Sequence, residues 1–279
     1  MCPRVGPRRY AAPRYGIVFL MADIPAPQLA AAARALMLAG RWAQATDLLA
    51  AVAPADGAER SALAVIAAEV AVDQDFWIRT ACGSRALDHA TSAVAGHDLD
   101  FLRLKHDYNA ELFRGWQPDA APRDPATVAG LADRAARLRD SAPSPGQRAW
   151  AAFYVGLVAD VLGDDTAAAR AAYEQARADA IEAGDELALS YALRHLGYLD
   201  AQAGAVEAGR QLLTQSLELR QRAGCVPHVL AQLLALAEFC DDKAWVQTVA
   251  GLVQGWASGL DGSPWLADAA AELLGSDAG

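Results

Sequence analysis

The sequence predicts an all-α protein built as an array of helical hairpins. Alanine is abundant, hydrophobic residues make up 54% of the chain and β-branched runs are few, a composition that favours helix. Apolar residues recur at helical spacing, and turn-forming segments interrupt them at a regular interval. We therefore expect six hairpins followed by one last helix, with no convincing strand.

The interval comes from the three clearest hairpins. They are residues 29–52, 149–180 and 190–221, which turn at Gly40, Gly163 and Gly204. The last two glycines are 41 residues apart, and the first lies three such intervals upstream. The interval predicts further turns near residues 81, 122 and 245, where turn-forming segments do occur, at residues 79–84, 115–125 and 240–245.

Two segments lie outside the hairpins. Residues 263–275 predict a last amphipathic helix, with Ser263 as its N-cap and Pro264 at its first position, which would cover the exposed end of the array. Residues 1–24 predict a disordered leader with Met21 as an alternative initiator, so the single domain is expected over residues 25–279.

Charge and cysteine content limit the function classes. The net charge is −10, and the four arginines among residues 1–20 leave the chain from Met21 onward at about −14. An acidic body argues against binding nucleic acid phosphates or an anionic membrane surface, and no uncharged apolar run of about 18 residues predicts a membrane span. The four cysteines lack metal or C-x-x-C spacing, which favours free thiols and a cytoplasmic location.

The hairpins resemble the tetratricopeptide repeat, in which small residues stand at fixed places on both helices and a glycine stands at the turn. The matching residues are Gly197, Gly204, Gly209 and Ser216 in the fifth hairpin, Gly156, Gly163, Ala169 and Ala176 in the fourth, and Ala33, Gly40, Trp42 and Ala45 in the first. The 41-residue interval is nearer to the longer arrays of bacterial transcriptional regulators. At Gly197, we expect alanine to be tolerated and leucine to force the two helices apart.

The resemblance implies that the first helix of each hairpin lines a concave groove. Aromatic and ionisable residues are concentrated on the first helices of hairpins two to six. The candidate ligand- or partner-binding residues are Tyr191, Arg194, His195, Tyr198, Trp150, Tyr154, Asp160, His106, Tyr108, Asn109 and His228. Other interpretations stay open, because Trp150 is also typical of a core residue and Arg194 of a solvated surface.

Motifs for catalysis and cofactors are absent. The sequence has no phosphate-binding G-x-x-x-x-G-K-[ST] loop, no G-x-G-x-x-G after a strand, no G-x-S-x-G elbow and no zinc-ligand spacing. We therefore expect no cofactor and no metal.

Three functions remain. The first is a scaffold whose groove holds a peptide or protein partner. The second is a small-molecule-binding protein or enzyme with a groove pocket, in which His106, His195 or Asp160 would supply acid–base chemistry. The third is a homo-oligomer in which the last helix covers a neighbouring chain. A deep aromatic pocket would favour the second hypothesis and a long open trough the first.

Overall fold

A computed structural model describes residues 24–117, 119–259 and 263–275. The described ranges fold as thirteen α-helices and no strand, so the predicted all-α class is confirmed. The predicted leader lies outside the described residues, apart from Ile24. The helices are α1 (Ala26–Leu38), α2 (Trp42–Ala50), α3 (Gly57–Ile78), α4 (Gly83–Ala93), α5 (His97–Gly115), α6 (Pro125–Asp140), α7 (Pro145–Leu157), α8 (Thr166–Ala183), α9 (Glu186–Gln202), α10 (Val206–Arg222), α11 (Val226–Ala237), α12 (Lys243–Gly259) and α13 (Pro264–Gly275).

Turns join successive helices at the predicted places. Gly40 and Gly204 lie between α1 and α2 and between α9 and α10, with φ angles of 72° and 92° that favour glycine. The turns predicted near residues 81 and 122 fall in the connections after α3 and α5, and the sixth turn comes a few residues before residue 245. Helix α7 continues into a five-residue π-helix, η1 (Val158–Leu162), just before Gly163.

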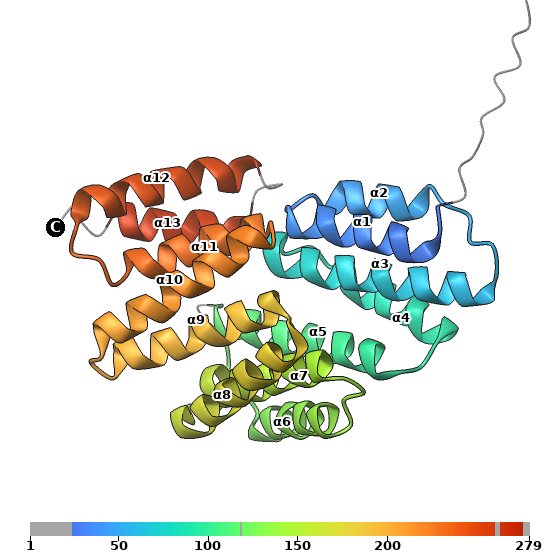
Figure 1. The fold of residues 1–279 in the computed structure, drawn as a ribbon, viewed down its shortest axis with the longest axis horizontal. Helices are drawn as coiled ribbons and strands as arrows, with labels where there is room; N and C mark the ends of the chain where they lie inside the picture. The colour runs from blue at the N-terminus through green and yellow to red at the C-terminus, as the bar shows by residue number, and fades with distance from the viewer. Residues whose placement is uncertain (1–23, 118, 260–262, 276–279) are drawn as a thin grey trace, which may run out of the picture.

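The C-terminal helix packs against the N-terminal part of the chain. Helix α13 contacts α12, α11 and also α3, and the groups of helices α1–α3 and α11–α13 lie side by side in Figure 1. The Trp265 ring stacks on Trp77 with centroids 5.2 Å apart, and the Ser263 hydroxyl donates a 2.9 Å hydrogen bond to the Trp77 carbonyl. Helix α13 therefore does more than cover the last hairpin, because it joins the two ends of the array.

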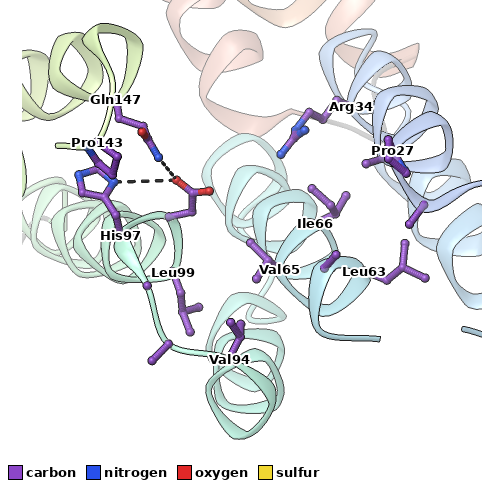
Figure 2. A pocket seen from close by; sticks show the side chains of 16 residues that line it. Pro27, Arg34, Leu63, Val65, Ile66, Val94, His97, Leu99, Pro143 and Gln147 are labelled. Carbon is purple, nitrogen blue, oxygen red and sulfur yellow. Dashed lines mark hydrogen bonds and ion pairs between the residues drawn. The ribbon is translucent and has the colours of Figure 1, made fainter. Parts of the chain in front are cut away.

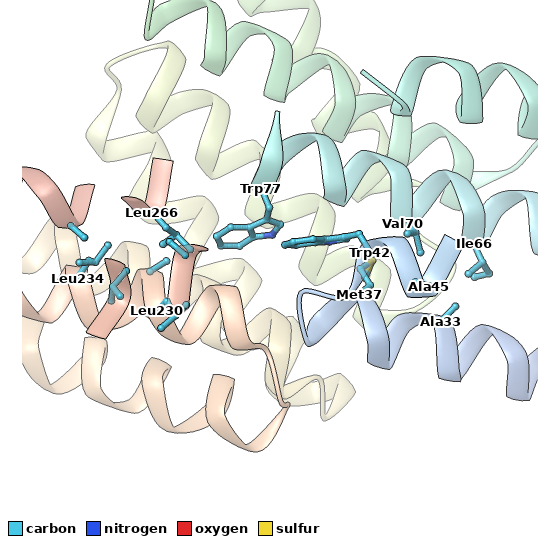
Figure 3. Close-up of a cluster of buried hydrophobic side chains, with 14 of the residues drawn as sticks. Ala33, Met37, Trp42, Ala45, Ile66, Val70, Trp77, Leu230, Leu234 and Leu266 are labelled. Atoms are coloured by element: carbon cyan, nitrogen blue, oxygen red, sulfur yellow. The ribbon is translucent and has the colours of Figure 1, made fainter. Parts of the chain in front are cut away.

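A shared hydrophobic core makes this junction. Trp42 and Trp77 are fully buried between α1–α3 and α11–α13, and Leu230 and Leu266 pack on the C-terminal side of the same cluster (Figure 3). A second cluster, centred on Phe153, fills the space among α5 to α9. Together they bury enough apolar surface to hold the array in one closed arrangement.

Helices α9 and α10 cross at two glycines, and here one expectation is wrong. Gly197 lies at the crossing, as predicted, but a Cβ atom there would come within 2.9 Å of the Gly209 carbonyl oxygen. That neighbour is backbone, which moves only if the helices separate. Alanine at Gly197 is therefore expected to be destabilising, because close packing outweighs its gain in helix propensity.

Candidate functional site

A pocket of about 380 Å³ lies inside the array. Helices α3, α5, α7, α9, α10, α11 and α13 contribute to its wall, together with η1. Eight aromatic side chains line it, namely Phe76, Trp77, Tyr108, Trp116, Phe153, Tyr154, Tyr191 and Trp265. Trp116 is 49% exposed, so we place the mouth of the pocket beside it.

The structure brings seven of the eleven predicted site residues to this wall. They are Tyr108, Asn109, Tyr154, Tyr191, Arg194, His195 and His228. Three others hydrogen-bond elsewhere, since Trp150, Tyr198 and His106 contact the carboxylates of Asp185, Glu238 and Asp107 respectively. The last, Asp160, lies directly behind His195.

His195 and Asp160 form a hydrogen-bonded group with Tyr173. The Tyr173 hydroxyl donates to Asp160 Oδ2 at 3.0 Å, and His195 Nδ1 lies 3.1 Å from that hydroxyl and 3.5 Å from the same carboxylate oxygen. Asp160 belongs to η1, and π-helical turns often occur at functional sites. His195 lines the pocket, and with Nδ1 facing Asp160 and Tyr173 its Nε2 has no hydrogen-bond partner among the described residues.

The pKa of His195 is lowered, which favours the neutral form of its ring. Burial is the main cause that lowers the pKa of His195 below 6.5, and the hydrogen bond with Asp160 partly opposes this effect. The same hydrogen bond lowers the pKa of Asp160, which stays ionised. A neutral imidazole whose Nδ1–H faces a carboxylate carries its lone pair on Nε2, as a general base requires.

We expect Asp160→Asn to lower the pKa of His195 further. The substitution removes the carboxylate that stabilises the imidazolium, while burial, which disfavours the imidazolium, remains. Titration of the His195 ring resonances by NMR should give a midpoint below 6.5 in the native protein and a lower one in the variant. An unchanged or higher midpoint in the variant would show that Asp160 does not act on His195.

The charged side chains of the pocket are one ion pair and two arginines. Asp73 is buried and accepts hydrogen bonds from Lys105 Nζ at 3.2 Å and Trp42 Nε1 at 2.9 Å. Arg194 and Arg220 also line the wall, and no described carboxylate pairs with either of them. The pocket therefore carries positive charge inside an acidic protein.

Several buried polar atoms of the wall have no hydrogen-bond partner among the described residues. They are Trp77 Nε1, Asn109 Nδ2, His228 Nδ1 and Trp265 Nε1. A buried group left unpaired costs about 1–3 kcal/mol. Four unpaired polar atoms therefore belong to residues that line the pocket.

A second pocket of about 470 Å³ lies among α1, α3 and the connections that precede α5 and α7 (Figure 2). Its wall is mostly small and aliphatic. Its two longest polar side chains are engaged, because Gln147 donates to Asp98 at 2.7 Å and Arg34 pairs with Glu69 at 2.8 Å, while His97 Nδ1 is buried without a hydrogen-bond partner among the described residues. The aromatic pocket, with its unpaired arginines, is the stronger candidate.

Sequence reasoning missed several residues of the aromatic pocket. Arg220 is on the second helix of its hairpin, in a stretch that looks like a solvated basic helix end, and Trp265 is on the last helix. The groove hypothesis counted only first helices. Trp265 itself was an available signal, since a tryptophan on a short amphipathic helix favours a buried contact.

Comparison with known proteins gives no family for the chain: no family model and no curated protein matches it. Among the described helices none is long and apolar enough to cross a membrane. Within the same ranges, no group of three or more His, Cys, Asp or Glu side chains is placed to hold a metal ion.

Proposed function

We propose that this protein binds a small organic molecule in the aromatic pocket. The observation that carries the proposal is the composition of the wall, in which eight aromatic rings surround a few convergent polar groups. This combination is typical of small-molecule sites, and a volume of about 380 Å³ falls within their usual range. The scaffold would be a tetratricopeptide-like array, as the spacing of its hairpin turns supports.

The closed arrangement of the helices favours this function over a peptide groove. A bound peptide needs a trough open along its length, whereas the Trp77–Trp265 stack joins the two ends of the array. The peptide or protein partner that the sequence predicts for the concave groove stays a prediction. Helix α13 packs on its own chain, which also weakens the hypothesis that it covers a neighbour.

Binding of the neutral fluorescent probe N-phenyl-1-naphthylamine tests the proposal. We expect one saturable site per chain. Leu157→Trp and Ala231→Leu add bulk to the pocket wall and should abolish probe binding, whereas Leu252→Trp on the exposed face of α12 should not. Melting curves check that each variant is folded. Absence of saturable binding, or binding that survives both filling substitutions, would contradict the proposal.

A second candidate function is acid–base catalysis on the bound molecule. It is favoured by the Asp160–His195 pair, because His195 lines the pocket and its Nδ1 faces Asp160. His195→Gln tests this candidate separately from binding. The variant should keep the N-phenyl-1-naphthylamine site and lose turnover of any substrate identified by screening. Unchanged turnover would restrict the protein to binding.

A further inference from the structure

Arg220 is an arginine buried without a counter-ion at the pocket wall. Only 2% of its surface is exposed. Its Nε and Nη1 atoms donate to Ser190 Oγ at 3.4 Å and to the His228 carbonyl at 3.1 Å, both neutral acceptors, and its guanidinium lies 4.9 Å from the centre of the Tyr191 ring. Its Nη2 group makes no hydrogen bond with the described residues.

Arg194 brings a second positive charge to the same wall from α9. Its Nη1 donates to the Ala231 carbonyl and to Gln232 Oε1, each at 3.0 Å. Its Nε and Nη2 make no hydrogen bond with the described residues. The two arginines are close enough for the charge of Arg194 to lower the pKa of Arg220, although burial is the larger cause. The resulting value of about 9 leaves Arg220 charged at neutral pH.

None of the remaining ionisable groups near this position forms an ion pair with Arg220 or Arg194 among the described residues. Asp73 is engaged by Lys105, and burial keeps His228 neutral by lowering its pKa well below 6.5. Burial raises the pKa of Glu238, which accepts a hydrogen bond from Tyr198 and also feels the charge of Arg194. Placing two like charges in a low-dielectric wall is costly, and a ligand anion would remove that cost.

We propose that the ligand of the aromatic pocket is an organic oxyanion, whose carboxylate or phosphate group is held by Arg220 and Arg194 and whose apolar body lies among the aromatic rings. The inference rests on the proposed function and names its ligand class. The free Nη2 of Arg220 and the free Nε and Nη2 of Arg194 supply N–H donors suited to such a group. The body would pack against Trp77, Tyr154 and Tyr191.

Binding of three related probes tests this assignment by calorimetry. The probes are 1-naphthaleneacetate, 1-naphthyl phosphate and the neutral 1-naphthaleneacetamide, which share one apolar body. We expect at least one anion to bind about tenfold to a hundredfold more tightly than the amide, since a hydrogen bond to a charged group contributes that much. The tighter of the two anions identifies the oxyanion.

Arginine variants show which side chains cause the preference for the anion. Arg220→Gln and the less buried Arg194→Gln should each remove most of the preference for the anion and leave amide binding little changed. Arg210→Gln is the matched control, because Arg210 is on the same helix as Arg220 but 48% of its side chain is exposed. Equal binding of amide and anions, or an unchanged preference in both pocket variants, would overturn the assignment. If N-phenyl-1-naphthylamine and the amide bind in the pocket but the anions bind no more tightly than the amide, the proposed function stands and the anion assignment fails.

Discussion

Replacing Trp77 with alanine is expected to lower the free energy of unfolding by about 3–5 kcal/mol. Only 1% of Trp77 is exposed, and its ring contacts Trp265, Phe76 and His228 at the place where α13 meets α3. The substitution leaves a large cavity in this junction. It also removes part of the pocket wall, so affinity for N-phenyl-1-naphthylamine should fall in the variant molecules that remain folded.

Trp256→Ala is the matched control. Trp256 is on α12 and 52% exposed, so its loss should change stability little. Urea unfolding followed by circular dichroism measures both variants. Equal and small effects of the two substitutions would mean that the ends of the array are not joined through Trp77.

Gly209→Ala is expected to lower the free energy of unfolding by about 1–3 kcal/mol or more. A Cβ atom at Gly209 would lie 2.5 Å from the Gly197 carbonyl oxygen and 2.9 Å from the Ala201 backbone nitrogen, distances that require α9 and α10 to separate. Because α9 carries Arg194 and His195 and α10 carries Arg220, the same separation should weaken binding of 1-naphthaleneacetate.

Alanine at Gly251 should have the opposite effect on the free energy of unfolding. Gly251 is an exposed residue within α12, and an added Cβ would meet no atom within 4 Å. There alanine should stabilise the protein by about 0.5–1 kcal/mol through reduced conformational freedom of the unfolded chain. Thermal unfolding of both variants checks the contrast. Destabilisation of similar size at Gly251 would mean that helix crossing is not the cause.

The hairpin architecture could be predicted from local chemistry. Turn residues such as Gly40 and Gly204 and capping residues such as Asp165 and Asp185 act within a few positions of the chain. A repeat also stacks each hairpin on the next, so the periodicity alone predicts which helices are neighbours. These features required no knowledge of long-range contacts.

The pocket could not be predicted from the sequence, because it depends on long-range contacts that no local sequence pattern encodes. The hydrogen bond from Ser263 to Trp77 joins residues 186 positions apart. The closure of the array, and with it the place of Trp265 in the wall, depends on the contact between α13 and α3. The first-helix rule predicted Tyr191, Arg194 and His195, which line the pocket. It missed Arg220 because a buried arginine without a counter-ion has the same sequence signature as an exposed one.

A crystal structure of the protein with 1-naphthaleneacetate tests the central claim, that the closed array holds a small organic anion, most directly. The account predicts that the naphthalene ring lies among Trp77, Tyr154 and Tyr191, with a carboxylate oxygen within hydrogen-bonding distance of Arg220 Nη2. A ligand bound only on the outer surface, with the aromatic pocket filled by protein side chains, would contradict it.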